Sequence, residues 1–306
     1  MSQRQRVLVT GAAGMLGSQL LLDVPEGIDA IGTDLVGARF DTAPDVALVG
    51  EDLTDMARVE ALFAREEDKG TPLTGIIHGA AYTAVDKAEE EQDLARRVNA
   101  LAPENLARAC AARDIPMVLV STDFVFDGTQ RSPYVEEDKP SPLGVYGRTK
   151  FEGEQLARAV YPTGVRVVRT QWLYGPRGNH FPGTMLRLAK SNERLRVVDD
   201  QRGAPTTTLE LSPALWDVLL QGEAGVYHAA CEGEATWFDL ASETLRLCGD
   251  ETPVDPCTTE EFPRPAPRPA YSVMACAKLT ALRGRSLVSW QQALDDFLRA
   301  EGLVTT

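Results

Sequence analysis

The sequence predicts an α/β fold: a doubly wound parallel sheet with helices on both faces, followed by a smaller lobe. Short runs of β-branched residues alternate with longer helical stretches through the first half of the chain, which implies right-handed crossovers between parallel strands. The strand candidates are mostly apolar, as expected where helices cover both faces of a sheet. With 306 residues the chain can also bury a sizeable core.

Predicted strands alternate with helical stretches through the first half. The predicted strands span 6–10, 29–33, 75–80, 116–121 and 165–169. Helical periodicity is present at 56–65, 86–98 and 103–113. Ser141 and Pro142 can cap and open a further helix, on which Tyr146 and Lys150 share one face.

The second half of the chain is less regular. After Thr170, Trp, Pro and Gly become more frequent. Helices are expected at 183–190, 209–220, 237–247 and 290–300, with one strand at 225–229. The stretch 263–269 reads PRPAPRP, which is too rich in proline for a helix or a central strand and is predicted to be a loop.

Composition excludes several classes of partner. The net charge of −14 argues against nucleic acid and anionic membranes, and no apolar run approaches the roughly 20 residues that a membrane span needs. The N-terminus runs directly into the first strand, so no signal peptide is expected. Five cysteines without a CxxC pair or a Cys/His cluster predict reduced thiols in the cytoplasm and no metal site.

A glycine-rich turn follows the first strand. Gly11, Gly14 and Gly17 form a GxxGxxG pattern, and Met15 and Leu16 open the next helix. Glycine permits a tight turn and close approach of the backbone to a pyrophosphate, while the helix N-terminus offers N–H donors. A strand before the loop and a helix after it are the required context, so a Rossmann-like dinucleotide site is predicted.

Asp34 ends the second predicted strand, seventeen residues after Gly17. A carboxylate at this point can accept both ribose hydroxyls of NAD and repels the 2′-phosphate of NADP. Arg39 is close enough in sequence to soften that repulsion. The cofactor is therefore expected to be NAD(P)H, with a preference for NADH.

Carbonyl reduction is the chemistry that three further residues indicate. A free tyrosine has a pKa of about 10 and is a poor acid–base group at neutral pH. The ammonium of Lys150 beside Tyr146 is expected to lower that pKa. Thr122, at the end of a predicted strand, can add a hydroxyl hydrogen bond to the same carbonyl oxygen.

Taken together, these motifs resemble the extended short-chain dehydrogenases, and within them the dTDP-4-dehydrorhamnose reductase family. The resemblance covers nearly the whole chain. It is carried by TAVDKAE (83–89), STDFVFDG (121–128), YGRTKFEGE (146–154), VVRTQWLYG (167–175), GNHFPGTMLRLAK (178–190), VVDDQRGAPT (197–206) and RPAPRPAYS (264–272).

The resemblance implies reduction of the C4 ketone of dTDP-4-dehydro-L-rhamnose to dTDP-L-rhamnose. It implies a catalytic set of Thr122, Tyr146 and Lys150, the last two also touching the cofactor. Cofactor contacts are implied at Gly11, Gly14, Met15, Leu16, Gly17, Asp34, Asp52, Leu53, Ala80, Ala81, Tyr82 and Asn99. Substrate contacts are implied at Asp123, Phe124, Trp172, Arg268 and Ser272, with Arg268 and Ser272 near the diphosphate.

Domain organisation also follows from the resemblance. A dinucleotide-binding domain is expected at 1–170, and the substrate-binding lobe is expected mainly at 171–306. Because extended members interleave their lobes, 207–230 should return to the first domain. The sequence leaves a homodimer open.

Several residues depart from the family pattern. Phe124 stands where the family usually has Tyr, His180 replaces a usual Asn, and Gln171 replaces a Ser or Thr before Trp172. The segment 35–50 is longer than usual. These departures affect the identity of the sugar and the choice of cofactor, and leave the reaction class unchanged.

Rival functions are open at this point. One rival is another enzyme of the same superfamily, an epimerase or a 4,6-dehydratase. A dehydratase would need an acidic residue where Phe124 stands, and Phe124 cannot do acid–base work. A reductase for a different nucleotide deoxysugar stays open. So does a non-catalytic NAD(P)-binding subunit, resembling the regulatory partner of methionine adenosyltransferase, although an intact Thr122, Tyr146 and Lys150 weighs against it.

Overall fold

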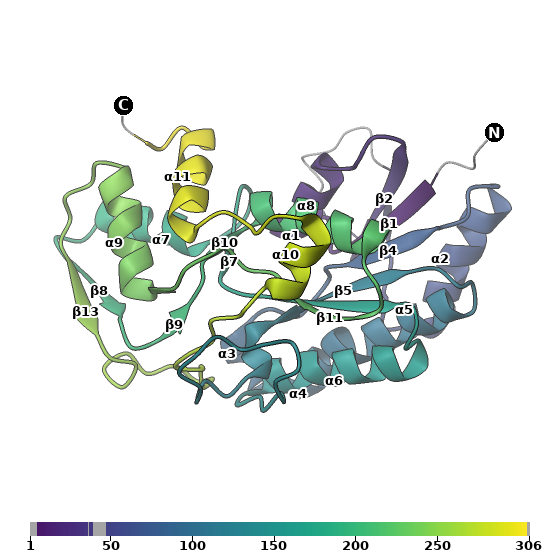
Figure 1. Cartoon of the computed structure of the whole chain (residues 1–306), viewed down its shortest axis with the longest axis horizontal. Helices are drawn as coiled ribbons and strands as arrows, with labels where there is room; N and C mark the ends of the chain where they lie inside the picture. Colours follow the sequence, from purple (N-terminus) through teal and green to yellow (C-terminus); the bar gives the residue numbers. More distant parts are fainter. Residues whose placement is uncertain (1–4, 36, 39–46, 305–306) are drawn as a thin grey trace.

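A seven-stranded parallel sheet forms the centre of the protein, as the computed structural model shows (Figure 1). The structure describes residues 5–35, 37–38 and 47–304. The strand order is β11-β6-β5-β4-β1-β2-β3, which confirms the predicted doubly wound α/β class. The strands are β1 (Gln5–Thr10), β2 (Ile28–Asp34), β3 (Ala47–Gly50), β4 (Gly75–His78), β5 (Met117–Thr122), β6 (Val165–Thr170) and β11 (Gly225–His228).

Helices cover both faces of the sheet. Alternate residues of one strand enter different cores: Val7 and Val9 pack on one side and Leu8 on the other, because successive side chains of a strand point to opposite faces. On the first side lie α1 (Met15–Leu22), α8 (Thr208–Gln221) and α10 (Ala277–Arg283). On the second side lie α2 (Met56–Asp68), α5 (Ala102–Ala111) and α6 (Val145–Val160).

A second lobe lies beside one end of the sheet (Figure 1). Its core joins α7 (Phe181–Ala189) and α9 (Trp237–Leu247) to the paired strands β8 (Leu195–Val198) and β13 (Val254–Cys257). Two short pairs complete the connection, and α11 (Trp290–Ala300) packs against this lobe and the first core. The short pairs are β7 (Leu173–Tyr174) with β10 (Thr206–Thr207), and β9 (Arg202–Gly203) with β12 (Ala235–Thr236).

The chain crosses between the two parts more than once. β11 pairs in parallel with β6, with Val226 opposite Val167, although part of the second lobe lies between them in sequence. Trp216 of α8 is buried against the sheet, and its indole N–H donates to the carbonyl of Leu20 at 3.1 Å. Sequence order therefore does not divide this molecule into two consecutive halves.

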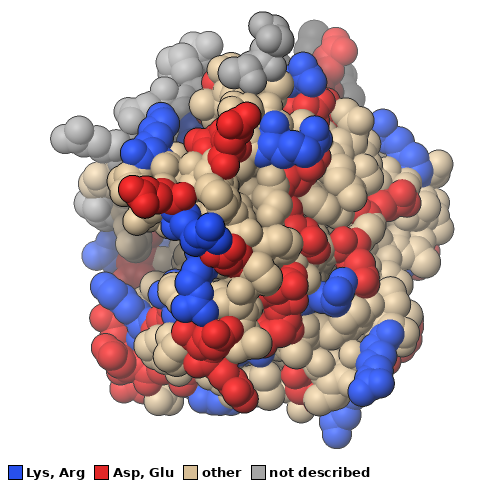
Figure 2. Space-filling model, turned by 90° about the vertical axis from the view of Figure 1, so that its left-hand side faces the viewer, with Lys and Arg blue, Asp and Glu red and all other residues tan. Residues whose placement is uncertain are grey.

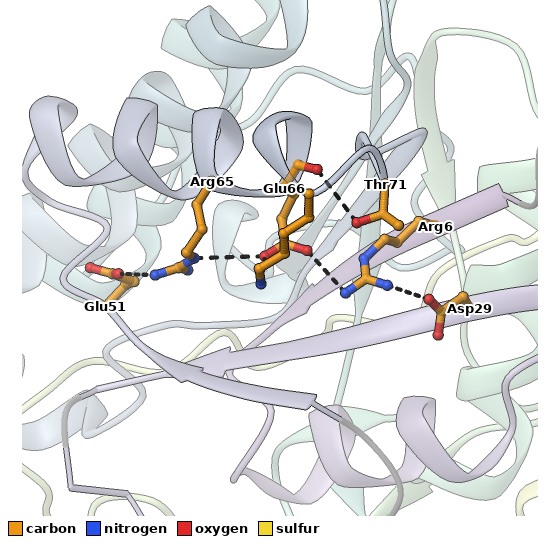
Figure 3. Close-up of polar contacts among 7 residues, drawn as sticks. Arg6, Asp29, Glu51, Arg65, Glu66 and Thr71 are labelled. Atoms are coloured by element: carbon orange, nitrogen blue, oxygen red, sulfur yellow. Dashed lines mark hydrogen bonds and ion pairs between the residues drawn. The ribbon is translucent and has the colours of Figure 1, made fainter.

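Ion pairs tie α2 to the first two strands at the end of the sheet away from the glycine turn (Figure 3). Glu66 is fully buried and pairs with Arg6 at 2.9 Å and with Lys69 at 2.8 Å. Arg6 also pairs with Asp29 of β2. The opposite charges lower the pKa of Glu66, against the burial that would raise it.

Opposite charges also alternate over the end of the molecule formed by the second lobe (Figure 2). Arg194 and Arg196 extend from the β8 side and pair with Asp255 at 2.6 Å and Glu261 at 3.0 Å. These surface pairs are exposed and therefore contribute little to stability. Arg194 and Arg196 are thus each matched to a carboxylate.

Two predicted helices differ from the structure. The stretch 86–98 is not one helix but α3 (Val85–Ala88), α4 (Gln92–Arg96) and a π-helical turn, η1 (Arg97–Leu101). The expectation that Ser141 and Pro142 begin a helix is wrong, since α6 begins at Val145 after Gly144. The carboxylate of Glu89 accepts from the Val145 backbone N–H at 2.8 Å, so a distant residue caps this helix.

Other expectations are met closely. α9 and α11 begin and end at the predicted residues, and 263–269 is a loop. Among the described residues, no helix has both the length and the apolar character needed to cross a membrane. Arg39 and most of the segment 35–50 lie outside the described residues.

Candidate active site

A cavity of about 850 Å³ opens at the carboxyl ends of the parallel strands. This is the edge at which open α/β sheets bind their ligands. Residues at the ends of six strands contribute to its wall, and the second lobe closes one side through Trp172 and Leu173. A volume of this size accommodates a large ligand or two smaller ones.

The glycine turn forms one wall of the cavity. Gly11 has a φ of +70°, and a Cβ added there would lie 2.8 Å from the backbone nitrogen of Ala80. A Cβ at Gly17 would lie 2.0 Å from the carbonyl oxygen of Gly11. Gly14, Met15 and Leu16 line the same wall at the start of α1. Only glycine fits this close packing, and the helix N-terminus faces the space that a pyrophosphate would need.

Asp34 and Asp52 line the next part of the wall. The Asp34 carboxylate accepts from the backbone N–H of Ala13 at 2.9 Å, which fixes it beside the glycine turn. Asp52 accepts from the backbone N–H and the hydroxyl of Thr54 at 3.0 and 2.8 Å. These hydrogen bonds lower the pKa of Asp52. Glu51 lines the cavity beside them, a residue that the sequence analysis did not identify.

The segment after β4 brings Ala80 and Ala81 to the cavity, close to Leu53. Tyr82 and Asn99 are not among the described residues that line it. Asn99 is buried, accepts from the Tyr82 backbone N–H at 2.8 Å and donates to the Tyr82 carbonyl at 3.1 Å. Asn99 thus clamps the backbone of the wall at the π-helical turn, where widened helices often carry functional residues.

Thr122, Tyr146 and Lys150 line the same cavity. Tyr146 and Lys150 lie one turn apart on α6, and Thr122 ends β5. The Lys150 ammonium donates to the carbonyl of Val120 at 2.7 Å, and the Thr122 hydroxyl donates to Asp123 Oδ1 at 3.0 Å. The structure therefore brings the three predicted catalytic residues together.

The electrostatics of this centre differ from the expectation. Burial raises the pKa of Tyr146 to about 12; the contact with the Thr122 hydroxyl opposes this rise, and the charge of Asp123 adds to it. Burial also lowers the pKa of Lys150 to about 8, while Glu154 opposes that shift. We expected the Lys150 ammonium to lower the pKa of Tyr146. Among the described residues, Lys150 does not contribute to the shift. At neutral pH Tyr146 is a phenol that carries its proton, the form that can act as an acid.

The buried ion pair between Glu154 and Arg169 lies behind the catalytic candidates. Glu154, one turn after Lys150, makes two hydrogen bonds with Arg169 at 3.0 and 2.7 Å and accepts from the Ser121 hydroxyl at 2.5 Å. The side chains of Glu154 and Arg169 are 2% and 3% exposed. Their contact joins α6 to β5 and β6, and so holds Thr122 and Lys150 in register. The residues of this pair are far apart in sequence, which is why no local pattern revealed it.

Asp123, Phe124 and Trp172 line the side of the cavity nearest the second lobe. Phe124 meets Tyr146 edge to face, with ring centroids 5.5 Å apart. Trp172 has a φ of +48°, rare for a bulky residue, and its indole stacks on Trp237 at 3.7 Å. Backbone conformations of this kind cluster at functional sites.

Two predicted substrate residues are not among the described residues of the cavity wall. Arg268 pairs with Asp86 at 3.0 Å and donates to the carbonyl of Ala266. Ser272 is buried, 3.4 Å from the side-chain oxygen of Gln171. The wall instead includes Thr170, the last residue of β6, and Gln171, which follows it; their position at a strand end was the available signal. Within the described ranges, no group of three or more His, Cys, Asp or Glu side chains is arranged to hold a metal ion.

The fold and this cavity define a dinucleotide-binding α/β protein with a Tyr–Lys pair at the ends of its strands. The chain belongs to the family described as the RmlD substrate binding domain, whose model matches residues 5–302. It is 39% identical over 306 residues to the dTDP-4-dehydrorhamnose reductase of Mycolicibacterium smegmatis, covering 99% of this chain and 88% of that protein.

Two further relatives bear on the site. The chain is 39% identical over 303 residues to the probable dTDP-4,6-dihydroxy-2-methyloxan-3-one 4-ketoreductase of Streptomyces antibioticus, covering 97% of each. The crystal structure of dTDP-4-dehydrorhamnose reductase from Bacillus anthracis in complex with NADP superposes with a TM-score of 0.86 at 34% identity. That comparison covers 97% of this chain and 99% of the other.

Proposed function

We propose that this protein reduces the C4 ketone of a dTDP-4-dehydro-6-deoxy sugar with NAD(P)H, and that its substrate is dTDP-4-dehydro-L-rhamnose. The carrying observation is a single cavity with a glycine turn at one end and Thr122, Tyr146 and Lys150 at the other. The names of the relatives in Mycolicibacterium smegmatis and Bacillus anthracis support this substrate. The product would be dTDP-L-rhamnose.

The glycine turn fits a nicotinamide dinucleotide, because Gly11 and Gly17 leave space that any Cβ would fill. When bound, the reduced cofactor supplies the hydride for the ketone carbon. Lys150 uses one of its three N–H bonds on the Val120 carbonyl, so the others can hold ribose hydroxyls. Asp34 would accept from the ribose at the adenosine end.

Proton transfer is the part that this chain performs itself. As the hydride forms the new C–H bond, negative charge develops on the ketone oxygen, and Tyr146 gives its phenolic proton to that oxygen. The Thr122 hydroxyl turns from Asp123 to donate to the same oxygen. Lys150, with a pKa of about 8, can then pass a proton back to the phenolate at neutral pH.

A preference for NADH is part of the proposal. Asp34, Glu51 and Asp52 line the wall where the adenosine ribose would lie. Three carboxylates there would repel the two negative charges of a 2′-phosphate. The related Bacillus anthracis structure, however, holds NADP. Measuring kcat/KM with NADH and with NADPH tests the preference, and a higher value with NADH supports it.

The domain division follows the proposed chemistry. Residues 1–170 together with 207–230 would bind the dinucleotide, and the remainder of 171–306 would mainly bind the sugar nucleotide. Arg268 and Ser272 would approach the diphosphate once Arg268 exchanges Asp86 for phosphate oxygens.

All five cysteines are free thiols, which supports a cytoplasmic location. Light scattering tests whether the protein forms a homodimer, which the sequence leaves open.

A turnover assay tests this function. Oxidation of NADH or NADPH is followed at 340 nm with a panel of dTDP-4-keto sugars. Fastest turnover of the rhamnose precursor supports the proposal. Faster turnover of a 2-deoxy sugar would favour a role like that named for the Streptomyces antibioticus relative. Absence of turnover with every sugar and both cofactors would contradict the reductase and favour a non-catalytic binding subunit.

A further inference from the structure

Three neighbouring residues of the cavity wall carry buried polar atoms that lack a hydrogen-bond partner among the described residues. They are Asp123 Oδ2, Thr170 Oγ1 and Gln171 Nε2. The residues are only 1%, 6% and 2% exposed. Buried polar groups are nearly always paired, and leaving one unpaired is unfavourable. Their concentration in one wall indicates a place shaped for a polar ligand.

The orientation of the Gln171 amide follows from its neighbours. Its Oε1 accepts from the backbone N–H of Ala204 at 3.0 Å and lies 3.4 Å from the Ser272 hydroxyl. Since both neighbours can donate, the amide oxygen must be on their side, and the NH₂ group must be on the other. The absence of a side chain at Gly203 makes space for the Gln171 amide, because a Cβ there would lie 2.9 Å from Oε1.

Asp123 and Gln171 follow Thr122 and Thr170, which lie opposite each other at the ends of the paired strands β5 and β6. Asp123 Oδ1 accepts from the Thr122 hydroxyl at 3.0 Å, and Ser272 neighbours both the carboxylate and the Gln171 amide. Ser272 has a single hydroxyl proton and cannot satisfy both acceptors at once. The wall therefore offers one unused donor, on Gln171, and one unused acceptor, on Asp123, connected through the same serine.

A donor next to an acceptor suits a hydroxyl group, which accepts one hydrogen bond and donates another, whereas a ketone oxygen only accepts. Asp123 directly follows Thr122, whose hydroxyl is the proposed partner of the ketone oxygen. A hydroxyl held by Asp123 would accordingly be on the carbon next to the ketone. In a 4-ketosugar with a methyl group at C5, that carbon is C3.

We propose that Gln171 is a sugar-binding residue whose Nε2 donates to the C3 hydroxyl of the substrate while Asp123 Oδ2 accepts from it. The pair selects 4-ketosugars that carry a C3 hydroxyl against their 3-deoxy analogues. This inference rests on the proposed ketoreductase function and names a specificity determinant within it.

The experiment compares kcat/KM for a dTDP-4-keto-6-deoxy sugar and its 3-deoxy analogue. Gln171→Glu keeps the oxygen that Ala204 and Ser272 need and replaces the donor nitrogen by an oxygen. We expect kcat/KM to fall by roughly 10–100-fold on the hydroxylated sugar and to change little on the 3-deoxy analogue. Gln292→Ala, which removes an exposed glutamine of α11, is the matched control and should match wild type on both sugars.

A double variant distinguishes loss of the specific hydrogen bonds from general damage to the site. Asp123→Asn combined with Gln171→Glu again places one donor beside one acceptor, with their positions exchanged. We expect the double variant to recover part of the preference for the hydroxylated sugar that Gln171→Glu loses. Failure to recover any preference would count against the hydroxyl pair.

Other outcomes separate the inference from the function on which it rests. If wild type reduces both sugars equally well, or if Gln171→Glu loses the same factor on both, the inference is wrong and the reductase stands. If wild type reduces neither sugar with NADH or NADPH, the proposed function itself fails.

Discussion

The buried carboxylate of Asp123 is predicted to destabilise the folded protein while it serves substrate binding. The variant Asp123→Asn tests this prediction. Its carboxyl is 1% exposed, and burial raises its pKa from 3.8 to about 6, although hydrogen bonds from Ser272 and Thr122 oppose the rise. Each pKa unit corresponds to about 1.4 kcal/mol. The charged carboxylate therefore destabilises the folded protein by up to about 3 kcal/mol above pH 6.

The sign of the pH dependence follows from the raised pKa. Between pH 3.8 and about 6 the folded state binds more protons at Asp123 than the unfolded state does, so stability falls as the pH rises through this window. Asparagine keeps the shape of the side chain and removes the charge. We expect Asp123→Asn to raise Tm by roughly 4–6 °C at pH 8, to have a much smaller effect near pH 4.5, and to lower kcat/KM.

Differential scanning calorimetry across pH 4.5–8 measures this effect. Asp127→Asn is a control of opposite sign, because hydrogen bonds from Thr129 lower the pKa of Asp127. That variant should be destabilised at pH 8. If Asp123→Asn instead loses stability equally at pH 4.5 and pH 8, burial does not disfavour the carboxylate and the reasoning is refuted.

Three further predictions concern the reaction, the cofactor and the fold. Tyr146→Phe should lower kcat by roughly 10²–10⁴-fold while cofactor affinity, measured by fluorescence titration, stays close to wild type; near wild-type turnover would remove the tyrosine from the mechanism. Asp34→Ala should narrow the ratio of kcat/KM for NADH over NADPH, since a repelling carboxylate is lost; a wild type that strongly prefers NADPH would already contradict this role. Glu66→Gln should lower the free energy of unfolding in urea by about 3 kcal/mol at pH 7, because it weakens a buried ion-pair network. The lowered pKa of Glu66 means that this contribution is present above pH 4.5 and is lost as the pH falls through the folded-state pKa. The control is Glu67→Gln, because Glu67 is the neighbouring residue and pairs with Arg113 at an exposed position. This variant should change the free energy of unfolding by less than about 1 kcal/mol.

Local signals determined the fold class and several boundaries. α9 begins where predicted because Thr236 caps it and Asp239 completes a capping box three residues later. α11 likewise begins after Ser289, whose side chain accepts from the N–H of Gln292. The glycine turn was recognisable because its three glycines, the strand before them and the helix after them are contiguous.

Long-range contacts decided the features that local patterns could not show. The cap of α6 is Glu89, 56 residues before Val145, so the local Ser141–Pro142 signal predicted the wrong start. The single predicted helix at 86–98 failed for a similar reason: Asn99 turns its amide to the backbone of Tyr82 and to Thr149, 50 residues away, at the point where the helix widens.

The same division applies to the active site. The types and spacing of Thr122, Tyr146 and Lys150 were readable from the sequence, because the tyrosine and the lysine lie one helical turn apart. Their protonation was not, since the pKa of Tyr146 depends on its burial and on contacts with Thr122 and Asp123. The roles of Glu154 and Gln171 were hidden for the same physical reason. A side chain's burial and hydrogen-bond partners come from segments that only the folded chain brings together, while helix periodicity and caps act within a few residues.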